Sequence, residues 1–272
     1  MRRNPCFVAI IFLALLPGCS GTAGDVPVAT TASGFGTHYV VTGTGEPVVL
    51  VHGFSQTHAA WLDTPLFQDL TRDHKVIAVD LRGHGDSDKP HDPMAYGRHM
   101  QADLAKLLDH LDIDEAHFVG FSMGASIVGD LLVSSPGRVR TAAMISGYFT
   151  TWHESEEEFA QEIENRESED ERFPWEPANQ DYRALAAAIR GIEYAVVSPD
   201  EVASIKTPTL IVFGSIELEH MPESRRTGLE NMPGSVEVLI IDGADHDSSN
   251  AAVLNPALSR AVREHIAANS AH

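Results

Sequence analysis

The sequence is poor in cysteine and in basic residues. Only two of its 272 residues are cysteines, Cys6 and Cys19, and both lie near the N-terminus. We therefore expect no disulfide within the folded domain. Lysine and arginine total 19 against 39 acidic residues, which gives a formal net charge of −20. Because phosphate binding needs clustered basic side chains, nucleic acid is not expected as a partner.

Motifs for metals and nucleotides are also missing. The sequence has no His-Glu-x-x-His pair and no paired cysteines at metal-ligand spacing. It has neither the glycine fingerprint of dinucleotide-binding proteins nor a phosphate loop. Asp245, His246 and Asp247 are adjacent, but they have no upstream partners at ligand spacing. We therefore expect neither a metal ion nor a cofactor.

The apolar run near the N-terminus is too short to span a membrane. It covers ten residues, 7–16, whereas a transmembrane helix needs about 18 or more. Arg2 and Arg3 precede it. A short basic region followed by an apolar run of this length is typical of a signal peptide.

The end of this run resembles a bacterial lipobox, the signal in which a cysteine is lipidated and becomes the mature N-terminus. Its last residues are Leu-Pro-Gly-Cys, ending at Cys19. We expect residues 1–18 to be a signal peptide and Cys19 to anchor an exported protein to the cell envelope. The anchor would lie in the outer membrane if the cell has one, since Ser20 rather than aspartate follows. A secretory signal with an incidental cysteine is the alternative. Residues 19–33, rich in small side chains, are predicted to form a tether.

Beyond this segment, apolar runs of strand length alternate with helical patterns. The runs are apolar on both faces, as in a parallel sheet covered by helices on both sides. They are residues 48–51, 76–79, 117–119, 142–145, 209–213 and 236–241. One apolar stripe at helical spacing consists of Met100, Leu104, Leu107, Leu108 and Leu111. This alternation predicts an α/β fold with a mostly parallel, doubly wound sheet.

The alternation breaks at residues 148–204. This interval contains an acidic run, a bend rich in proline and tryptophan at 173–177, and a helical pattern at 182–192. We interpret it as a helical cap inserted over the C-terminal edge of the sheet, where ligands bind in open α/β sheets. The core would then consist of residues 34–147 and 205–272.

The most informative motif is Gly-Phe-Ser-Met-Gly at residues 120–124, between a strand-like run and a helical run. A serine on a sharp turn from strand to helix has a strained backbone and needs small neighbours. Such a turn exposes the Ser122 hydroxyl and directs the next N–H toward an incoming carbonyl oxygen. Taken alone, the pattern also fits a serine that caps a helix between two glycines.

Four separated segments together resemble the α/β-hydrolase fold superfamily, from Gly34 to the C-terminus. They are, in order, His-Gly-Phe at 52–54, Asp-Leu-Arg-Gly-His-Gly-Asp-Ser at 80–87, the serine motif, and Gly-Ala-Asp-His at 243–246. Each follows a predicted strand. The resemblance implies a hydrolase of the serine branch, with Ser122 as nucleophile. Within the second segment, His84 is expected to be structural.

The resemblance also implies roles around Ser122. A serine hydroxyl needs a general base, which would be His246. The histidine needs an acid that fixes its tautomer, and the superfamily commonly places this acid three residues beyond the glycine that ends the penultimate strand. That residue is Glu217, where aspartate is more common, and Glu219 is the alternative. The oxyanion would be bound by the backbone N–H groups of Phe54 and Met123.

The expected function is hydrolysis of a carboxylic ester or related acyl bond of a small molecule, through an acyl-enzyme. Serine at position 122 disfavours the dehalogenase and epoxide-hydrolase branches, which carry aspartate there. Lactonase, carbon–carbon hydrolase, peptidase and perhydrolase activities remain open. A function from another class also remains open, that of a non-enzymatic surface lipoprotein that uses the fold as a binding module.

Overall fold

The computed structural model describes most of the chain from residue 28 onward. The described residues are 28–30, 35–149, 156–166, 176–178, 180–192, 197–246 and 252–270. The predicted signal peptide, Cys19 and most of the predicted tether lie outside them, as does part of the predicted cap.

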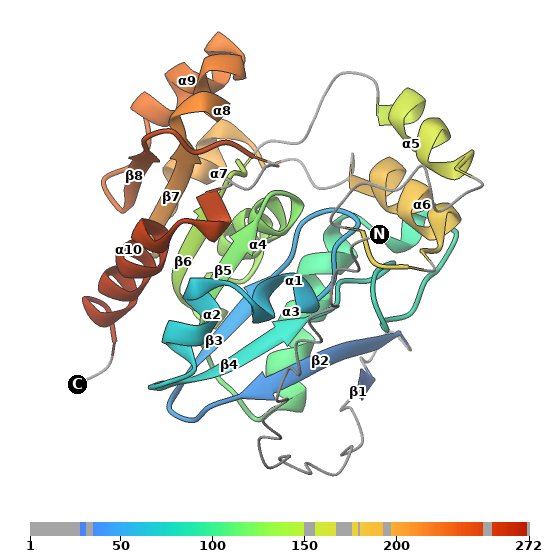
Figure 1. The fold of residues 1–272 in the computed structure, drawn as a ribbon, viewed down its shortest axis with the longest axis horizontal. Helices are drawn as coiled ribbons and strands as arrows, with labels where there is room; N and C mark the ends of the chain where they lie inside the picture. The colour runs from blue at the N-terminus through green and yellow to red at the C-terminus, as the bar shows by residue number, and fades with distance from the viewer. Residues whose placement is uncertain are drawn as a thin grey trace, which may run out of the picture.

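One sheet of eight strands forms the centre of the fold, in the order β1-β2-β4-β3-β5-β6-β7-β8 (Figure 1). The strands are β1 (Val28–Thr30), β2 (Gly36–Thr42), β3 (Glu46–Val51), β4 (His74–Val79), β5 (Ala116–Phe121), β6 (Val139–Ile145), β7 (Thr209–Gly214) and β8 (Val236–Ile241). Strand β2 runs antiparallel to β1 and β4, and all the other pairs are parallel. The predicted mostly parallel α/β sheet is therefore confirmed, and every strand-like run of the sequence falls within an observed strand.

Helices cover both faces of this sheet. The α-helices in the described part of the chain are α1 (Ala59–Leu62), α2 (Pro65–Leu70), α3 (Arg98–His110), α4 (Met123–Ser134), α5 (Glu156–Glu164), α6 (Tyr182–Ile192), α7 (Pro199–Ala203), α8 (Ser215–His220), α9 (Glu223–Glu230) and α10 (Pro256–Ala267). Short 3₁₀ helices are η1 (Pro93–Ala95), η2 (Pro136–Arg138) and η4 (Ala252–Leu254). In the described part of the chain, no helix is both long enough and apolar enough to cross a membrane.

The alternation of side chains along β3 explains the two helical layers. Val49 and Val51 belong to a core cluster with residues of α3 and α4. Val48 and Leu50 belong to a second cluster with residues of α2 and α10. Successive side chains of a strand point to opposite faces, so a strand that is apolar throughout needs a helical layer on each side.

Helices α5 and α6 form a separate layer (Figure 1). In the chain they lie between β6 and β7. They share a small core of Ala160, Ile163, Leu185, Ala186 and Ile189, against which Phe54 packs. The rings of Phe54 and Phe159 lie 5.7 Å apart. The interval predicted as a helical cap thus contains α5, α6 and α7, while its limits at 148 and 204 stay a prediction. The cap helices contact the loop that follows β3.

Asp130 is an ionisable group on α4, about two turns beyond Ser122. It lines a cavity of about 120 Å³ together with Gln101 of α3 and Glu201 of α7. Burial raises the pKa of Asp130 from its ordinary value of 3.8 to about 8, an effect that Arg98 opposes and Glu201 reinforces. The unfolded chain therefore loses this proton at a lower pH than the folded chain. Through this group, the free energy of unfolding falls as the pH rises from about 4 to about 8.

Replacing Asp130 with asparagine removes this ionisation. The stability of the variant relative to the wild type therefore increases as the pH rises. We expect the difference in melting temperature, variant minus wild type, to increase by several degrees between about pH 5 and pH 8. Thermal unfolding followed by circular dichroism across this range measures the difference. Asp114→Asn, at an exposed position, serves as the control. A difference that does not change with pH would contradict the prediction.

Candidate active site

Ser122 stands on the turn between β5 and α4. Its backbone has φ 52° and ψ −118°, a conformation that is strained for a residue with a side chain. Its N–H donates to the carbonyl oxygen of Ile145 on the neighbouring strand, at 2.8 Å. Although Ser122 occupies the N-cap position of α4, its side chain makes no capping hydrogen bond. The structure therefore does not support the alternative that this serine serves to cap a helix.

The glycines on either side of Ser122 allow three backbones to approach closely. A Cβ atom on Gly120 would lie 2.4 Å from the carbonyl oxygen of Gly124. A Cβ atom on Gly124 would lie 2.3 Å from the carbonyl oxygen of Val51, the last residue of β3. Contacts this short do not occur between real atoms, so both positions require glycine for this turn to form.

The structure brings Ser122, His246 and Glu217 together in a hydrogen-bonded chain. Ser122 Oγ lies 3.0 Å from His246 Nε2, and His246 Nδ1 lies 2.9 Å from Glu217 Oε1. His246 comes from the loop after β8, and its ring packs against that of Phe121, with centroids 5.4 Å apart. Only 13% of the Glu217 side chain is exposed, whereas Glu219 is an exposed residue. Of the two residues predicted as the acid, Glu217 is therefore the one that His246 contacts.

Two further groups hold the carboxylate of Glu217. Ser146 Oγ donates to Oε2 at 2.9 Å, and the N–H of Gly214 donates to the same atom at 3.4 Å. Ser146 was not predicted as a site residue. Like Ser122 it follows a buried strand and has a positive φ, here 51°. Its one signal in the sequence is the Ser-Gly pair at the end of the β6 run.

The loop after β3 is fixed by hydrogen bonds of His52, which is completely buried. Its Nε2 accepts from the N–H of Leu81 at 3.0 Å, so its Nδ1 carries the proton and donates to the carbonyl oxygen of Gly53 at 2.7 Å. Burial lowers the pKa of His52, which keeps the ring neutral. The N–H of Gly53 donates to Gln56 Oε1 at 2.9 Å. Sequence reasoning did not identify Gln56.

Both segments that carry the predicted oxyanion donors, Phe54 and Met123, adjoin Ser122. A Cβ atom on Gly53 would lie 3.3 Å from Ser122 Cβ, so the loop that carries Phe54 lies against the nucleophile position. Met123 is the first residue of α4, where backbone N–H groups have no partner within the helix. A carbonyl oxygen bound at Ser122 would therefore meet backbone donors in this corner.

A cavity of about 290 Å³ opens beside these residues. Its wall includes Ser122, His246 and Glu217, and it extends toward the end of α8. The remaining lining residues are Ser126, Ser146, Gly147, Tyr148, Phe213, His220, Met221 and Pro222. A hydroxyl, an imidazole and a carboxylate in hydrogen-bond contact thus share a cavity large enough for a small organic molecule.

A family model described as alpha/beta hydrolase fold matches residues 46–215. This stretch covers more than half of the chain and includes three of the four segments on which the resemblance rests. The chain belongs to the alpha/beta hydrolase fold family.

Curated relatives of this alpha/beta hydrolase match only part of it. Epoxide hydrolase 2 of Siraitia grosvenorii is 34% identical over 46% of the chain, a segment that spans 40% of that enzyme. A 2-hydroxy-6-oxo-2,4-heptadienoate hydrolase of Pseudomonas putida is 35% identical over 42% of each protein. Esterase YbfF of Escherichia coli is 41% identical over 35% of each protein. The matched segments therefore span less than half the length of these relatives.

Solved structures match over a much larger share of the chain. A thermophilic esterase from Thermogutta terrifontis has a TM-score of 0.76 and 22% sequence identity, and the match covers 90% of this chain and 99% of that one. At this identity the likeness establishes the fold. It leaves the reaction of this alpha/beta hydrolase to be argued from its own residues.

The turn at residues 82–85 is built as a structural element. Arg82 forms two hydrogen bonds with the carboxylate of Asp103, at 2.7 and 2.8 Å, and both side chains are buried. His84 is completely buried and packs against the rings of His52 and Phe54. Burial lowers the pKa of His84 to about 3, so this ring is neutral.

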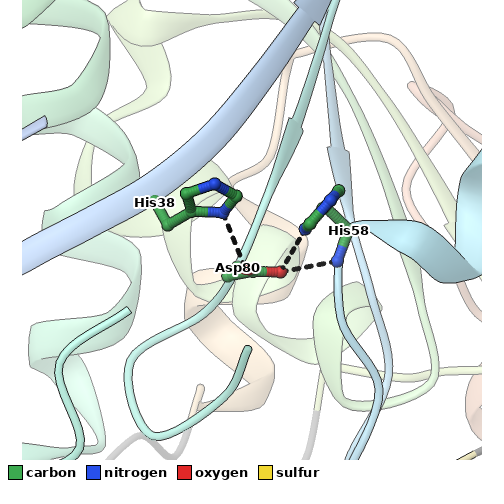
Figure 2. A group of neighbouring side chains, drawn as sticks. All are labelled: His38, His58 and Asp80. Carbon is green, nitrogen blue, oxygen red and sulfur yellow. Dashed lines mark hydrogen bonds and ion pairs between the residues drawn. The ribbon is translucent and has the colours of Figure 1, made fainter. Parts of the chain in front are cut away.

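His38, His58 and Asp80 form a cluster whose ligand atoms lie within 4.8 Å of one another (Figure 2). Asp80 Oδ2 accepts from His38 Nδ1 at 2.7 Å and from the N–H of Asp86 at 2.9 Å. Asp80 Oδ1 accepts from the N–H and the Nδ1 of His58, at 2.6 and 2.9 Å. Each oxygen of this buried carboxylate thus has two donors, which fits a hydrogen-bonded network better than a metal site.

The pKa values of this cluster fit an ionised carboxylate. Burial alone would raise the pKa of Asp80, but the hydrogen bonds from His58 and Asp86 hold it below its usual value. The same hydrogen bond to Asp80 raises the pKa of His58. Asp80 therefore fastens β2, the loop before α1 and the turn after β4 to one another.

Replacing Asp80 with alanine removes the acceptor of four hydrogen bonds and leaves buried donors unpaired. We expect the free energy of unfolding to fall by at least about 3 kcal/mol, as measured by urea denaturation. Asp86→Ala is the matched control, because Asp86 contributes its backbone N–H while its side chain is exposed. If zinc ions raised the melting temperature of the wild type but not that of Asp80→Ala, the cluster would be a metal site instead.

Proposed function

We propose that this alpha/beta hydrolase cleaves a carboxylic ester or a related acyl bond of a small molecule through an acyl-enzyme. The observation that carries the proposal is the chain of contacts from Ser122 Oγ to His246 Nε2 and from His246 Nδ1 to Glu217 Oε1, at 3.0 and 2.9 Å. A hydroxyl, an imidazole and a carboxylate in this order are what acyl transfer by serine requires.

In the first half of the reaction, Ser122 Oγ attacks the acyl carbon while His246 Nε2 takes the hydroxyl proton. The Nδ1–H of His246 donates to Glu217, which stabilises the positive charge on the ring. The negative charge on the former carbonyl oxygen is stabilised by the N–H groups of Met123 and Phe54. The intermediate collapses when His246 returns the proton to the departing alcohol oxygen, which leaves the acyl group on Ser122.

In the second half, a water molecule attacks the acyl group. His246 takes a proton from this water, and the same backbone donors stabilise the second intermediate. When that intermediate collapses, His246 returns the proton to Ser122 Oγ and the carboxylic acid leaves. The site residues end as they began, and no cofactor enters the reaction.

The residue at position 122 favours this reaction over that of the epoxide-hydrolase relatives. The epoxide-hydrolase branch of the fold carries aspartate at the elbow, whereas this chain has serine. The Escherichia coli esterase and the Pseudomonas putida heptadienoate hydrolase are among the relatives whose named activities fit a serine nucleophile. Cleavage of a carbon–carbon bond is therefore the second candidate activity, and it would use the same residues of this chain.

A fluorophosphonate probe tests whether Ser122 is a working nucleophile. We expect a single covalent adduct on the folded protein, mapped to Ser122 by peptide mass spectrometry, because the probe reacts with serines activated by a neighbouring base. Ser122→Ala should give no adduct, and Ser134→Ala, at the end of the same helix, should be labelled like the wild type. A folded wild type without an adduct would favour the binding-module alternative.

A pair of glutamine variants tests the acid. Glu217→Gln removes the charge that orients and stabilises His246, so we expect kcat/KM for a nitrophenyl ester to fall by roughly a thousandfold. Glu219→Gln changes an exposed side chain, and its kcat/KM should stay within about twofold of the wild type. Steady-state kinetics on the two purified variants measure the effect. Equal rates for both variants would mean that Glu217 does not act as the acid.

A further inference from the structure

We propose that the substrate ester has a hydroxyl or oxo substituent on the part that lies in the cavity beside Ser122. Ser126 and His220 bind this substituent. The proposal rests on the proposed function, since it concerns the substrate of the same site. Both residues line the cavity of about 290 Å³ that contains Ser122 and His246.

Ser126 lies one helical turn beyond the nucleophile. Ser126 belongs to α4, which begins directly after Ser122, and both residues line the same cavity. One turn of an α-helix rises about 5.4 Å. A substituent bound by Ser126 would therefore lie a few bonds from the acyl carbon that Ser122 attacks.

The hydroxyl of Ser126 has no hydrogen-bond partner among the residues that the structure describes. A serine inside a helix commonly bonds to the carbonyl oxygen four residues before it. Ser270, at the end of the chain, does this with the carbonyl oxygen of Ile266 at 3.1 Å. The corresponding bond from Ser126 Oγ to Ser122 is absent, although the N–H of Ser126 does donate to that carbonyl oxygen, at 3.2 Å. The hydroxyl is therefore available to a ligand.

His220 supplies a second polar group at the same cavity. It is the last residue of α8, and its ring forms no hydrogen bond or ion pair within the described part of the chain. An imidazole can both donate and accept hydrogen bonds, so it can bind a hydroxyl or an oxo group. It belongs to the same short helix as Glu217.

The other side chains of this wall are less suited to polar recognition. Phe213, Met221 and Pro222 are apolar, Ser146 already donates to Glu217, and Tyr148 is engaged in an interaction of its own. The cavity thus combines an apolar wall with two unengaged polar groups, the composition of a site that selects a short carbon chain with a polar substituent. An ester with a plain alkyl chain would leave the Ser126 hydroxyl unpaired, which penalises its binding.

Pairs of esters of equal size test the proposal. They also show whether the substituent belongs to the acyl side or to the alcohol side of the ester. On the acyl side, nitrophenyl β-hydroxybutyrate is compared with nitrophenyl isovalerate, which has a methyl group in place of the hydroxyl. On the alcohol side, hydroxyethyl butyrate is compared with propyl butyrate. For each pair the measured quantity is the ratio of kcat/KM, hydroxylated over alkyl ester. The side of the ester whose ratio changes when Ser126 is replaced is the side that lies in the cavity.

We expect Ser126→Ala to lower this ratio about three- to tenfold in one of the two pairs, the effect of one neutral hydrogen bond. His220→Leu should lower the ratio of the same pair. Ser134→Ala is the matched control, since Ser134 lies on α4 outside this cavity, and both of its ratios should equal those of the wild type. A variant Ser126→Ala with both ratios unchanged would overturn the proposal.

Fluorophosphonate labelling separates this outcome from a failure of the proposed function. If the wild type is labelled at Ser122 and cleaves the esters, unchanged ratios mean that the polar subsite alone is wrong. If the wild type is neither labelled nor active on any of the four esters, the hydrolytic function fails and the substrate inference fails with it.

Discussion

The close approach of three backbones around Ser122 is the constraint on which the rest of the site depends. The C-terminal end of β3, the turn after β5 and the first turn of α4 meet where Gly120 and Gly124 leave no room for a side chain. This contact sets the strained φ of Ser122. It also sets the position of the loop that carries His52 and Phe54. Because the strands are parallel, the loop that carries His246 reaches the same edge of the sheet.

The carboxylate of Glu217 depends on a second serine at the end of a strand. Ser146 follows β6 as Ser122 follows β5, and both have a positive φ. Ser122 presents its hydroxyl to His246, and Ser146 donates to Glu217. Glu217 lies in the first turn of α8, where the N–H of Gly214 also reaches its carboxylate. The carboxylate of Glu217, with its extra methylene, thus accepts hydrogen bonds from three groups, those of His246, Ser146 and Gly214.

The sequence alone was sufficient to predict six of the eight strands and the residues that the structure brings together at the sheet edge, because these depend on local patterns. Runs that are apolar on both faces marked the strands, and short motifs at strand ends marked Ser122 and His246. Ser146 and Gln56 escaped prediction because their roles depend on partners that the fold brings to them, over distances along the chain that no motif records. The Asp80 network was missed for the same reason. Its donors come from three separate segments of the chain.

Phe54 belongs to two parts of the molecule at once. Its ring is packed into the small core of α5 and α6, while its backbone is held in the loop fixed by His52. Phe54 therefore links the cap helices to the loop after β3, and the side chain of Gln180 adds a second link by donating to the carbonyl oxygen of Ser55 at 2.6 Å. A displacement of the α5–α6 pair cannot leave the ring of Phe54 behind without exposing apolar surface to water. A displacement of α5 and α6 would therefore also disturb the loop after β3 that carries Phe54.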